Sequence, residues 1–172
     1  VTSGCGQGTM YGNVMKQLED YQVPQNKIKQ SEIYTALEAL THYNDTYKKA
    51  GAVHGCAVCK DDKVLSFVED VGRHNAVDTL AGEMWLNKES GEDKIFYTTG
   101  RLTSEMVIKV AQMGIPVLLS RSGVTQMGLD LAQKFGITTI ARAKGLRFQV
   151  FTGADKIDFD VKGEQSAPGQ KA

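Results

Sequence analysis

The residues best suited to chemistry lie together in residues 69–75, a stretch that holds two acids, an arginine, a histidine and an asparagine. Each ionisable group needs an ion pair, a hydrogen bond or water, so few purely structural turns hold so many of them. Apolar residues of extended character precede the stretch, and an apolar stripe at helical spacing follows Gly72. We therefore expect a strand that runs into a helix, whose free N–H groups favour anions. In the structural alternative, Glu69 and Asp70 pair with Arg73 and the stretch only starts the helix.

A second candidate is Cys5, because four glycines surround it within residues 1–12. Glycine allows unusual backbone angles and the close approach of a ligand or partner. An accessible thiol is also a reactive one. Cys5 is therefore either a chemical group of the site or an incidental thiol in a chain terminus.

Two further cysteines, Cys56 and Cys59, have the two-residue gap of zinc and redox motifs. They fall in an apolar segment, residues 51–59, that predicts a buried strand with residues 64–68 as its hairpin partner. Side chains alternate along a strand, so the two thiols are expected on opposite faces. We favour two small buried hydrophobic residues, with metal binding or redox chemistry as alternatives. A zinc deaminase using His54 is disfavoured, because the glutamate two residues after the histidine and the proline before the cysteine pair are both missing.

The remaining pattern predicts the elements that must position these groups. Strands are expected at residues 94–99, 115–119, 137–141 and 146–152, and helices at 31–49, 75–87, 104–113 and 127–135. Ser31 and Thr103 are expected as caps, Glu105 lies in a first turn, and Thr125 precedes the last helix. Residues 142–145 read as a basic turn. Short buried strands that alternate with helices indicate parallel neighbours covered on both faces. We expect a three-layer α/β/α sandwich around a mixed sheet, in one domain over residues 1–161 with a disordered tail over 162–172.

Three turns of this predicted fold carry polar clusters: residues 69–75, 100–105 and 120–125. In a parallel sheet such turns meet at the edge formed by the carboxyl ends of the strands. Together they supply Arg73, His74, Arg101, Ser104, Arg121, Ser122 and Thr125, and Arg142 and Lys144 could join them. Several arginines at one crevice favour a small polyanionic ligand. No Walker A sequence is present and no GxGxxG opens a helix, which disfavours ordinary ATPase or Rossmann dehydrogenase chemistry.

Composition limits the class of protein further. The chain has 172 residues, a formal net charge of zero and three cysteines. A neutral chain argues against a general binder of nucleic acid or of a membrane surface, and no apolar run approaches the roughly 20 residues of a membrane span. An odd number of cysteines in a chain of this size fits reduced thiols and a cytoplasmic setting. The first residue is valine, so we expect a fragment or a processed product.

Four segments resemble the formate dehydrogenase accessory sulfurtransferase (FdhD) family. They are residues 2–6 (TSGCG), 51–54 (GAVH), 69–78 (EDVGRHNAVD) and 99–107 (TGRLTSEMV). The resemblance runs from about Thr2 to Thr152. It implies a sulfur carrier required for formate dehydrogenase, which takes persulfide sulfur from a cysteine desulfurase and delivers it to the molybdenum bis(molybdopterin guanine dinucleotide) cofactor. It also implies a cytidine deaminase-like fold, a homodimer, and a smaller N-terminal region that is absent here.

The resemblance also assigns roles to residues. Cys5 matches the persulfide carrier, whereas Gly8 stands where many members have a second cysteine. Either one cysteine suffices, or Cys56 or Cys59 substitutes. The guanine dinucleotide contact falls on Ile140, Ala141, Arg142, Ala143, Lys144 and Gly145, and Arg73, His74 and Arg101 are expected to bind the cofactor with them. No metal ligand is expected. The alternative is a chaperone that binds the cofactor without sulfur transfer. The roles of Glu69, Asp70 and His74 stay open.

Overall fold

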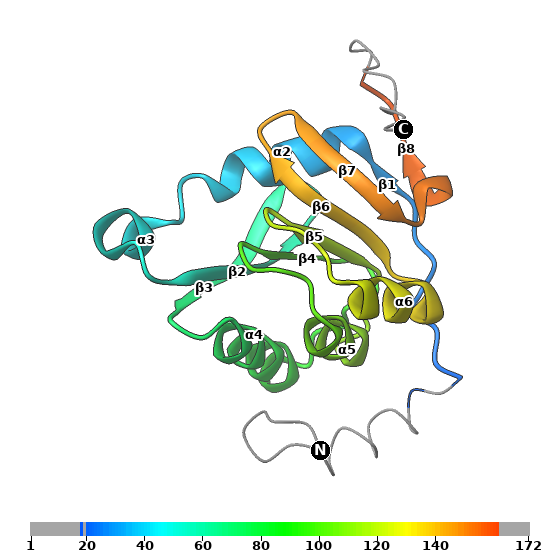
Figure 1. Cartoon of the computed structure of the whole chain (residues 1–172), viewed down its shortest axis with the longest axis horizontal. Coiled ribbons are helices and arrows are strands. Elements are labelled where there is room, and N and C mark those ends of the chain that lie inside the picture. The colour runs from blue at the N-terminus through cyan, green and yellow to red at the C-terminus, as the bar shows by residue number, and fades with distance from the viewer. Residues whose placement is uncertain (1–17, 19, 162–172) are drawn as a thin grey trace.

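The structure is a computed structural model that describes Leu18 and residues 20–161 (Figure 1). Its elements are β1 (Ile28–Lys29), α2 (Gln30–Leu40), α3 (Asp45–Ala50), β2 (His54–Lys60), β3 (Lys63–Asp70), α4 (Arg73–Asn87), β4 (Ile95–Thr98), α5 (Ser104–Gln112), β5 (Val117–Ser120), α6 (Gln126–Phe135), β6 (Thr138–Lys144), β7 (Arg147–Thr152), a 3-10 turn (Ala154–Lys156) and β8 (Ile157–Asp158). None of the described helices is long and apolar enough to cross a membrane. The prediction of a disordered tail falls on residues outside the described part.

Six strands form one mixed sheet in the order β3-β2-β4-β5-β6-β7. Strands β4, β5 and β6 are parallel neighbours, whereas β2 is antiparallel to both β3 and β4, and β7 is antiparallel to β6. Helices α4, α5 and α6 cover one face and α2 lies on the other (Figure 1). The predicted α/β/α sandwich around a mixed sheet is confirmed.

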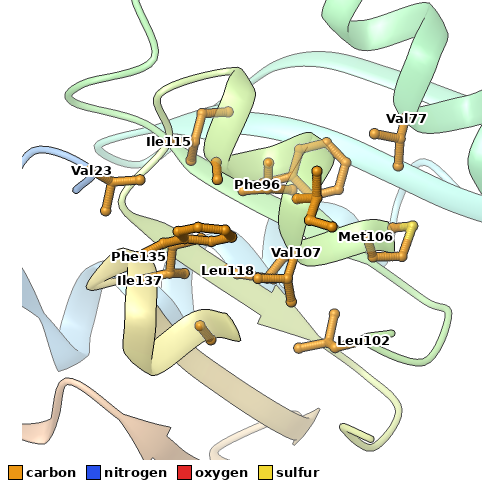
Figure 2. Close-up of a cluster of buried hydrophobic side chains, with 14 of the residues drawn as sticks. Val23, Val77, Phe96, Leu102, Met106, Val107, Ile115, Leu118, Phe135 and Ile137 are labelled. Carbon is orange, nitrogen blue, oxygen red and sulfur yellow. The ribbon is translucent and has the colours of Figure 1, made fainter. Parts of the chain in front are cut away.

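Each face of the sheet has its own hydrophobic core, because side chains alternate along every strand. Phe96 and Leu118 point toward the helices α4–α6, where Figure 2 shows them with Phe135 of α6. The next residue on each strand, Tyr97 or Leu119, points toward α2. This alternation places Cys56 in the first core and Cys59 in the second, so the prediction that they face opposite ways is confirmed.

The single helix predicted over residues 31–49 is wrong, because α2 ends at Leu40 and α3 begins at Asp45. Between them Asn44 is nearly buried and donates its side-chain amide to the Leu40 carbonyl oxygen at 2.9 Å. This bond satisfies a free carbonyl group of the last turn of α2. Ser31 does not cap α2 either: the cap position is Lys29, and the Ser31 hydroxyl bonds to Asp160 at 2.6 Å.

The basic turn predicted at residues 142–145 is also wrong. Strand β6 continues to Lys144, which pairs with Arg147, so the turn consists of Gly145 and Leu146. A register shift between Ala141 and Lys144 forms a β-bulge, and inside it Arg142 takes a left-handed φ of 53°. A bulge adds a residue to one strand only, and the sequence of that strand alone does not reveal it.

Candidate functional site

The carboxyl ends of the central strands form one continuous edge, because hydrogen bonds join each turn to the next. The Ser120 hydroxyl donates to the Gly100 carbonyl oxygen at 2.7 Å, and the Arg121 N–H donates to the Thr98 carbonyl oxygen at 3.1 Å. Farther along, the Arg142 N–H donates to the Ser122 carbonyl oxygen at 2.8 Å. The structure therefore brings together the turns that follow β4 and β5 and the bulge of β6.

The junction of β3 and α4 separates the roles of its two acids. Glu69 accepts the N–H groups of Thr46 and Tyr47, both at 2.8 Å, and so caps α3. Asp70 accepts the Gly72 N–H at 2.7 Å and the Asn75 amide at 3.1 Å, which fixes the start of α4. Neither acid forms an ion pair with Arg73 in the part of the chain that the structure describes. The structural alternative is thus wrong for the pairing with Arg73, and the cap position of α4 is Gly72, which has no side chain.

Arg73 crosses from α4 to the turn after β4. A Cβ atom built on Gly100 would lie 3.2 Å from Arg73 Cδ, so the absence of a side chain at Gly100 leaves room for the arginine. The Nε atom of Arg73 is buried and has no hydrogen-bond partner among the described residues. The absence of a side chain at Gly100 thus matters for the position of Arg73 rather than for backbone conformation, since the φ of Gly100 is not in the left-handed region.

His74 lies against the start of α5. Its Nε2 is 3.1 Å from a carboxylate oxygen of Glu105, and its Nδ1 is buried without a hydrogen-bond partner among the described residues. Burial, followed by the positive charge of Arg73, lowers the pKa of His74, while Glu105 opposes them. Sequence reasoning missed this pair, because it explained Glu105 by its place in a first helical turn.

Four basic side chains lie exposed on the turns and the bulge of this edge. They are Arg101, Arg121, Arg142 and Lys144, and none has a carboxylate within 4.0 Å among the described residues. An exposed cation without a protein partner remains available to an anionic ligand. The structure therefore gathers exposed cations at this edge, and binding of a polyanion there stays a prediction.

The segment expected to contact a guanine dinucleotide is only partly available to a ligand. The side chains of Ile140, Ala141 and Ala143 are buried in the two cores, so they hold the strand in place. Arg142, Lys144 and Gly145 are the exposed members of this segment. A ligand would therefore meet two cations and a glycine turn here.

The other polar residues of the three turns have structural roles. The Thr125 hydroxyl accepts the Gly128 N–H at 3.2 Å and caps α6. Thr103 occupies the cap position of α5, but its hydroxyl is buried without a partner among the described residues. Ser120, which sequence reasoning did not single out, holds two turns together by accepting the Ser122 N–H at 2.9 Å as well as donating to Gly100. The signal that could have found it is a hydroxyl at the end of a buried strand.

The two cysteines of the hairpin are buried as free thiols, 0% exposed. Burial raises the pKa of Cys56 to about 11, against a hydrogen bond to Thr98, and raises the pKa of Cys59 to about 12. A thiol held protonated is a poor nucleophile and a poor metal ligand. No group of three or more His, Cys, Asp or Glu side chains suited to a metal exists among the described residues. These observations argue against zinc binding or sulfur relay at Cys56 and Cys59. Cys5 lies outside the described residues.

Comparison with known proteins adds independent findings. The model of the FdhD/NarQ family matches residues 1–158. A curated relative, the "Sulfur carrier protein FdhD" of Listeria monocytogenes, is 30% identical over 160 residues, which is 91% of this chain and 61% of the relative. The chain thus spans about three fifths of the length of such relatives.

Two solved structures are also similar. One is a protein from Desulfotalea psychrophila described as a formate dehydrogenase accessory protein. It has a TM-score of 0.76 and 35% identity, and the match covers 83% of this chain and 61% of that one. A more distant match, with a TM-score of 0.47 and 17% identity over 60% of this chain and 94% of the other, is to a dCMP deaminase from the cyanophage S-TIM5.

Proposed function

Because the chain belongs to the FdhD/NarQ family, we propose that it is a sulfur carrier required for formate dehydrogenase activity. In this proposal Cys5 takes persulfide sulfur from a cysteine desulfurase. The substrate that receives the sulfur is the molybdenum bis(molybdopterin guanine dinucleotide) cofactor, before its insertion into the enzyme. The name of the Listeria relative supports sulfur carriage, and the description of the Desulfotalea structure supports an accessory role for formate dehydrogenase.

The loading step is a thiol–persulfide exchange. The thiolate of Cys5 attacks the outer sulfur of the donor persulfide, so that a new S–S bond forms on Cys5 while the S–S bond of the donor breaks. The donor cysteine leaves as a thiolate and takes up the proton that Cys5 lost, so the exchange needs no external oxidant or reductant. The glycines around Cys5 suit a residue that must meet two partners in turn.

The single observation that carries the proposal is the basic edge of the sheet. Arg101 and Arg121 come from two different connections and Arg142 from the bulge of β6, yet they share this edge without carboxylate partners among the described residues. A dinucleotide cofactor carries several phosphates, and arginine binds each with two parallel hydrogen bonds. We assign the phosphates of the cofactor to this edge, with Arg142 and Lys144 as the contacts from β6.

The decisive experiment is mass spectrometry of the chain after incubation with a cysteine desulfurase and cysteine. We expect one added sulfur atom on Cys5, removed by a reducing agent, and none on Cys56 or Cys59. A chain that gains no sulfur, or gains it only on the buried thiols, would contradict the proposal.

Cys5→Ala separates sulfur transfer from a chaperone that merely binds the cofactor. Sulfur transfer predicts that this variant still binds a guanine nucleotide but leaves formate dehydrogenase inactive in cells that depend on it. Cys59→Ala is the matched control, because it also removes one thiol but should support normal activity. Near-normal maturation with Cys5→Ala would favour the chaperone.

A further inference from the structure

Two consecutive residues at the start of α4 each leave a buried nitrogen without a hydrogen bond. These atoms are Nε of Arg73 and Nδ1 of His74, and neither has a partner among the described residues. Native proteins pair roughly 90% or more of their buried polar groups, with protein or with ordered water. Two such nitrogens on neighbouring residues are therefore able to bind a further group.

Both side chains lie against the same connection, residues 100–105, between β4 and α5. Arg73 packs beside Gly100 at one end of this connection, and His74 contacts Glu105 at the other. The acids next to Arg73 in the sequence are occupied, since Glu69 caps α3 and Asp70 accepts the Gly72 N–H just before α4. The positive charge of Arg73 thus has no carboxylate partner among the described residues.

We propose that the start of α4 and residues 100–105 enclose a subsite for an oxyanion, which binds Arg73 together with the protonated form of His74. The subsite deepens the proposed function and rests on it, because it assigns a binding chemistry to one part of the basic edge. The ligand group is a tetrahedral oxyanion of the phosphate type, either free or as part of a nucleotide.

The contact with Glu105 dictates how His74 takes part. A carboxylate only accepts hydrogen bonds, so the Nε2 that faces Glu105 carries a proton. In the neutral ring Nδ1 is then a bare acceptor and repels an anion. Protonation turns Nδ1 into a donor. Binding of the anion and protonation of His74 are therefore coupled.

The charges around the imidazole ring set the direction of this coupling. Arg73 and Asp78 on α4 and Glu105 and Lys109 on α5 face it, and Lys109 is bonded to Asp78 at 2.5 Å. Burial and Arg73 lower the pKa of the free His74, whereas a bound anion raises it. Affinity is thus highest below the pKa of the free protein and falls as the pH rises through the higher pKa of the complex. If the bound anion raises the pKa of His74 by one, the anion binds roughly tenfold more tightly at low pH than at high pH.

The experiment uses sulfate, an oxyanion that does not titrate near neutral pH, so any proton taken up belongs to the protein. The chain has three histidines, and NMR of the imidazole groups against pH follows each of them, with and without sulfate at constant ionic strength. We expect the pKa of His74 to rise by about one with sulfate while those of His42 and His54 stay unchanged. Equal changes at all three histidines, or none at His74, would overturn the subsite.

Substitution of Arg73 tests whether this arginine is needed for the effect of sulfate on His74. Arg73→Gln should abolish the effect of sulfate on His74, whereas Arg147→Gln on β7 is the matched control and should keep it. If Arg73→Gln does not fold, Arg73→Lys keeps the charge but loses Nε, and should weaken sulfate binding several-fold. Persulfide formation on Cys5 is measured separately. Loading of Cys5 with no response of His74 to sulfate would overturn the subsite and leave the proposed function standing.

Free phosphate and a nucleotide are then compared as the source of the oxyanion. Inorganic pyrophosphate and guanosine diphosphate are titrated into the wild-type chain at one pH. Tighter binding of guanosine diphosphate than of pyrophosphate assigns the subsite to a nucleotide phosphate, and equal binding assigns it to a free anion. Failure of both to compete with sulfate would contradict the subsite.

Discussion

The hydroxyl of Ser120 lies 2.7 Å from the carbonyl oxygen of Gly100, and this hydrogen bond joins the ends of β5 and β4. Both residues are buried, with Ser120 0% exposed. The same hydroxyl oxygen accepts the Ser122 N–H, so one side chain supports two turns of the basic edge.

Ser120→Ala should therefore lower the free energy of unfolding by about 1–3 kcal/mol, since it leaves a buried carbonyl group and an N–H unpaired. Urea denaturation measures the change. Ser122→Ala is the matched control, because the Ser122 hydroxyl makes no hydrogen bond within the described part of the chain, and it should change stability by less than about 0.5 kcal/mol. Equal effects of the two substitutions would show that the bond to Gly100 does not support the edge.

Gly100→Ala should weaken anion binding more than it weakens the fold. The new methyl group would lie 3.2 Å from Arg73 Cδ, and the flexible arginine can move away at the expense of its position. We expect sulfate affinity to fall several-fold, while the urea midpoint changes little. The measurement is NMR titration with sulfate beside urea denaturation.

Gly82→Ala provides the control for Gly100→Ala. Gly82 lies inside α4, and a Cβ atom there meets nothing within 4 Å. Alanine should stabilise the helix by about 0.5–1 kcal/mol and leave sulfate binding unchanged. Unchanged binding in Gly100→Ala, or equally weakened binding in Gly82→Ala, would refute the role given to the path of Arg73.

The effect of substituting Arg142 on stability should depend on whether the new residue tolerates a left-handed backbone. Its φ of 53° is left-handed, a region that β-branched residues strongly avoid. Arg142→Val should lower stability by about 1–2 kcal/mol, whereas Arg142→Gly should keep it. Both variants should bind a guanine nucleotide more weakly, because both remove the cation. A stable Arg142→Val variant would mean that the bulge rearranges easily.

The buried thiols should resist alkylation in the native state. At pH 8 the raised pKa values of Cys56 and Cys59, about 11 and about 12, leave almost no thiolate. Iodoacetamide followed by mass spectrometry should therefore modify neither residue until urea unfolds the chain. Rapid labelling of Cys56 in the native protein would show that the first core opens readily.

The same burial predicts how stability depends on pH in the alkaline range. An unfolded thiol titrates near its ordinary value of 9.0, while the folded thiols hold their protons to higher pH. The stabilisation is thus complete below pH 9.0 and is lost as the pH rises through the folded pKa of about 11. Urea denaturation at pH 8 and pH 10 should show a lower midpoint at pH 10 for the wild type, and a smaller difference for Cys56→Ala.

The strands and most helices could be predicted from the sequence, because hydrophobic periodicity records which residues face a core. The break after Leu40 could not, since Tyr47 keeps the helical spacing of Leu37 and Leu40 across it. What ends α2 is Asn44, a residue whose bond to Leu40 depends on the chain turning back. Hydrophobic periodicity gives no information about such hydrogen bonds between side chain and backbone.

The sequence predicted where the candidate site lies better than it predicted which side chains contact one another there. Parallel strands bring their carboxyl ends together by topology alone, so the meeting of the turns at residues 100–105 and 120–125 followed from the element order. The different hydrogen-bond partners of Glu69 and Asp70 could not be predicted from the element order, because the partners of Glu69 lie on α3, 22 and 23 residues earlier. The contact of His74 with Glu105 likewise joins two helices whose packing no single segment specifies.

The enclosure of Cys56 and Cys59 has a consequence for any sulfur held on Cys5. The 172 residues contain only two cysteines besides Cys5, and both of these are fully buried. A persulfide on Cys5 would therefore meet no exposed thiol from the described hairpin that could attack it and release the cargo as sulfide. Under the proposed function, release of the sulfur would then depend on an acceptor outside these 172 residues.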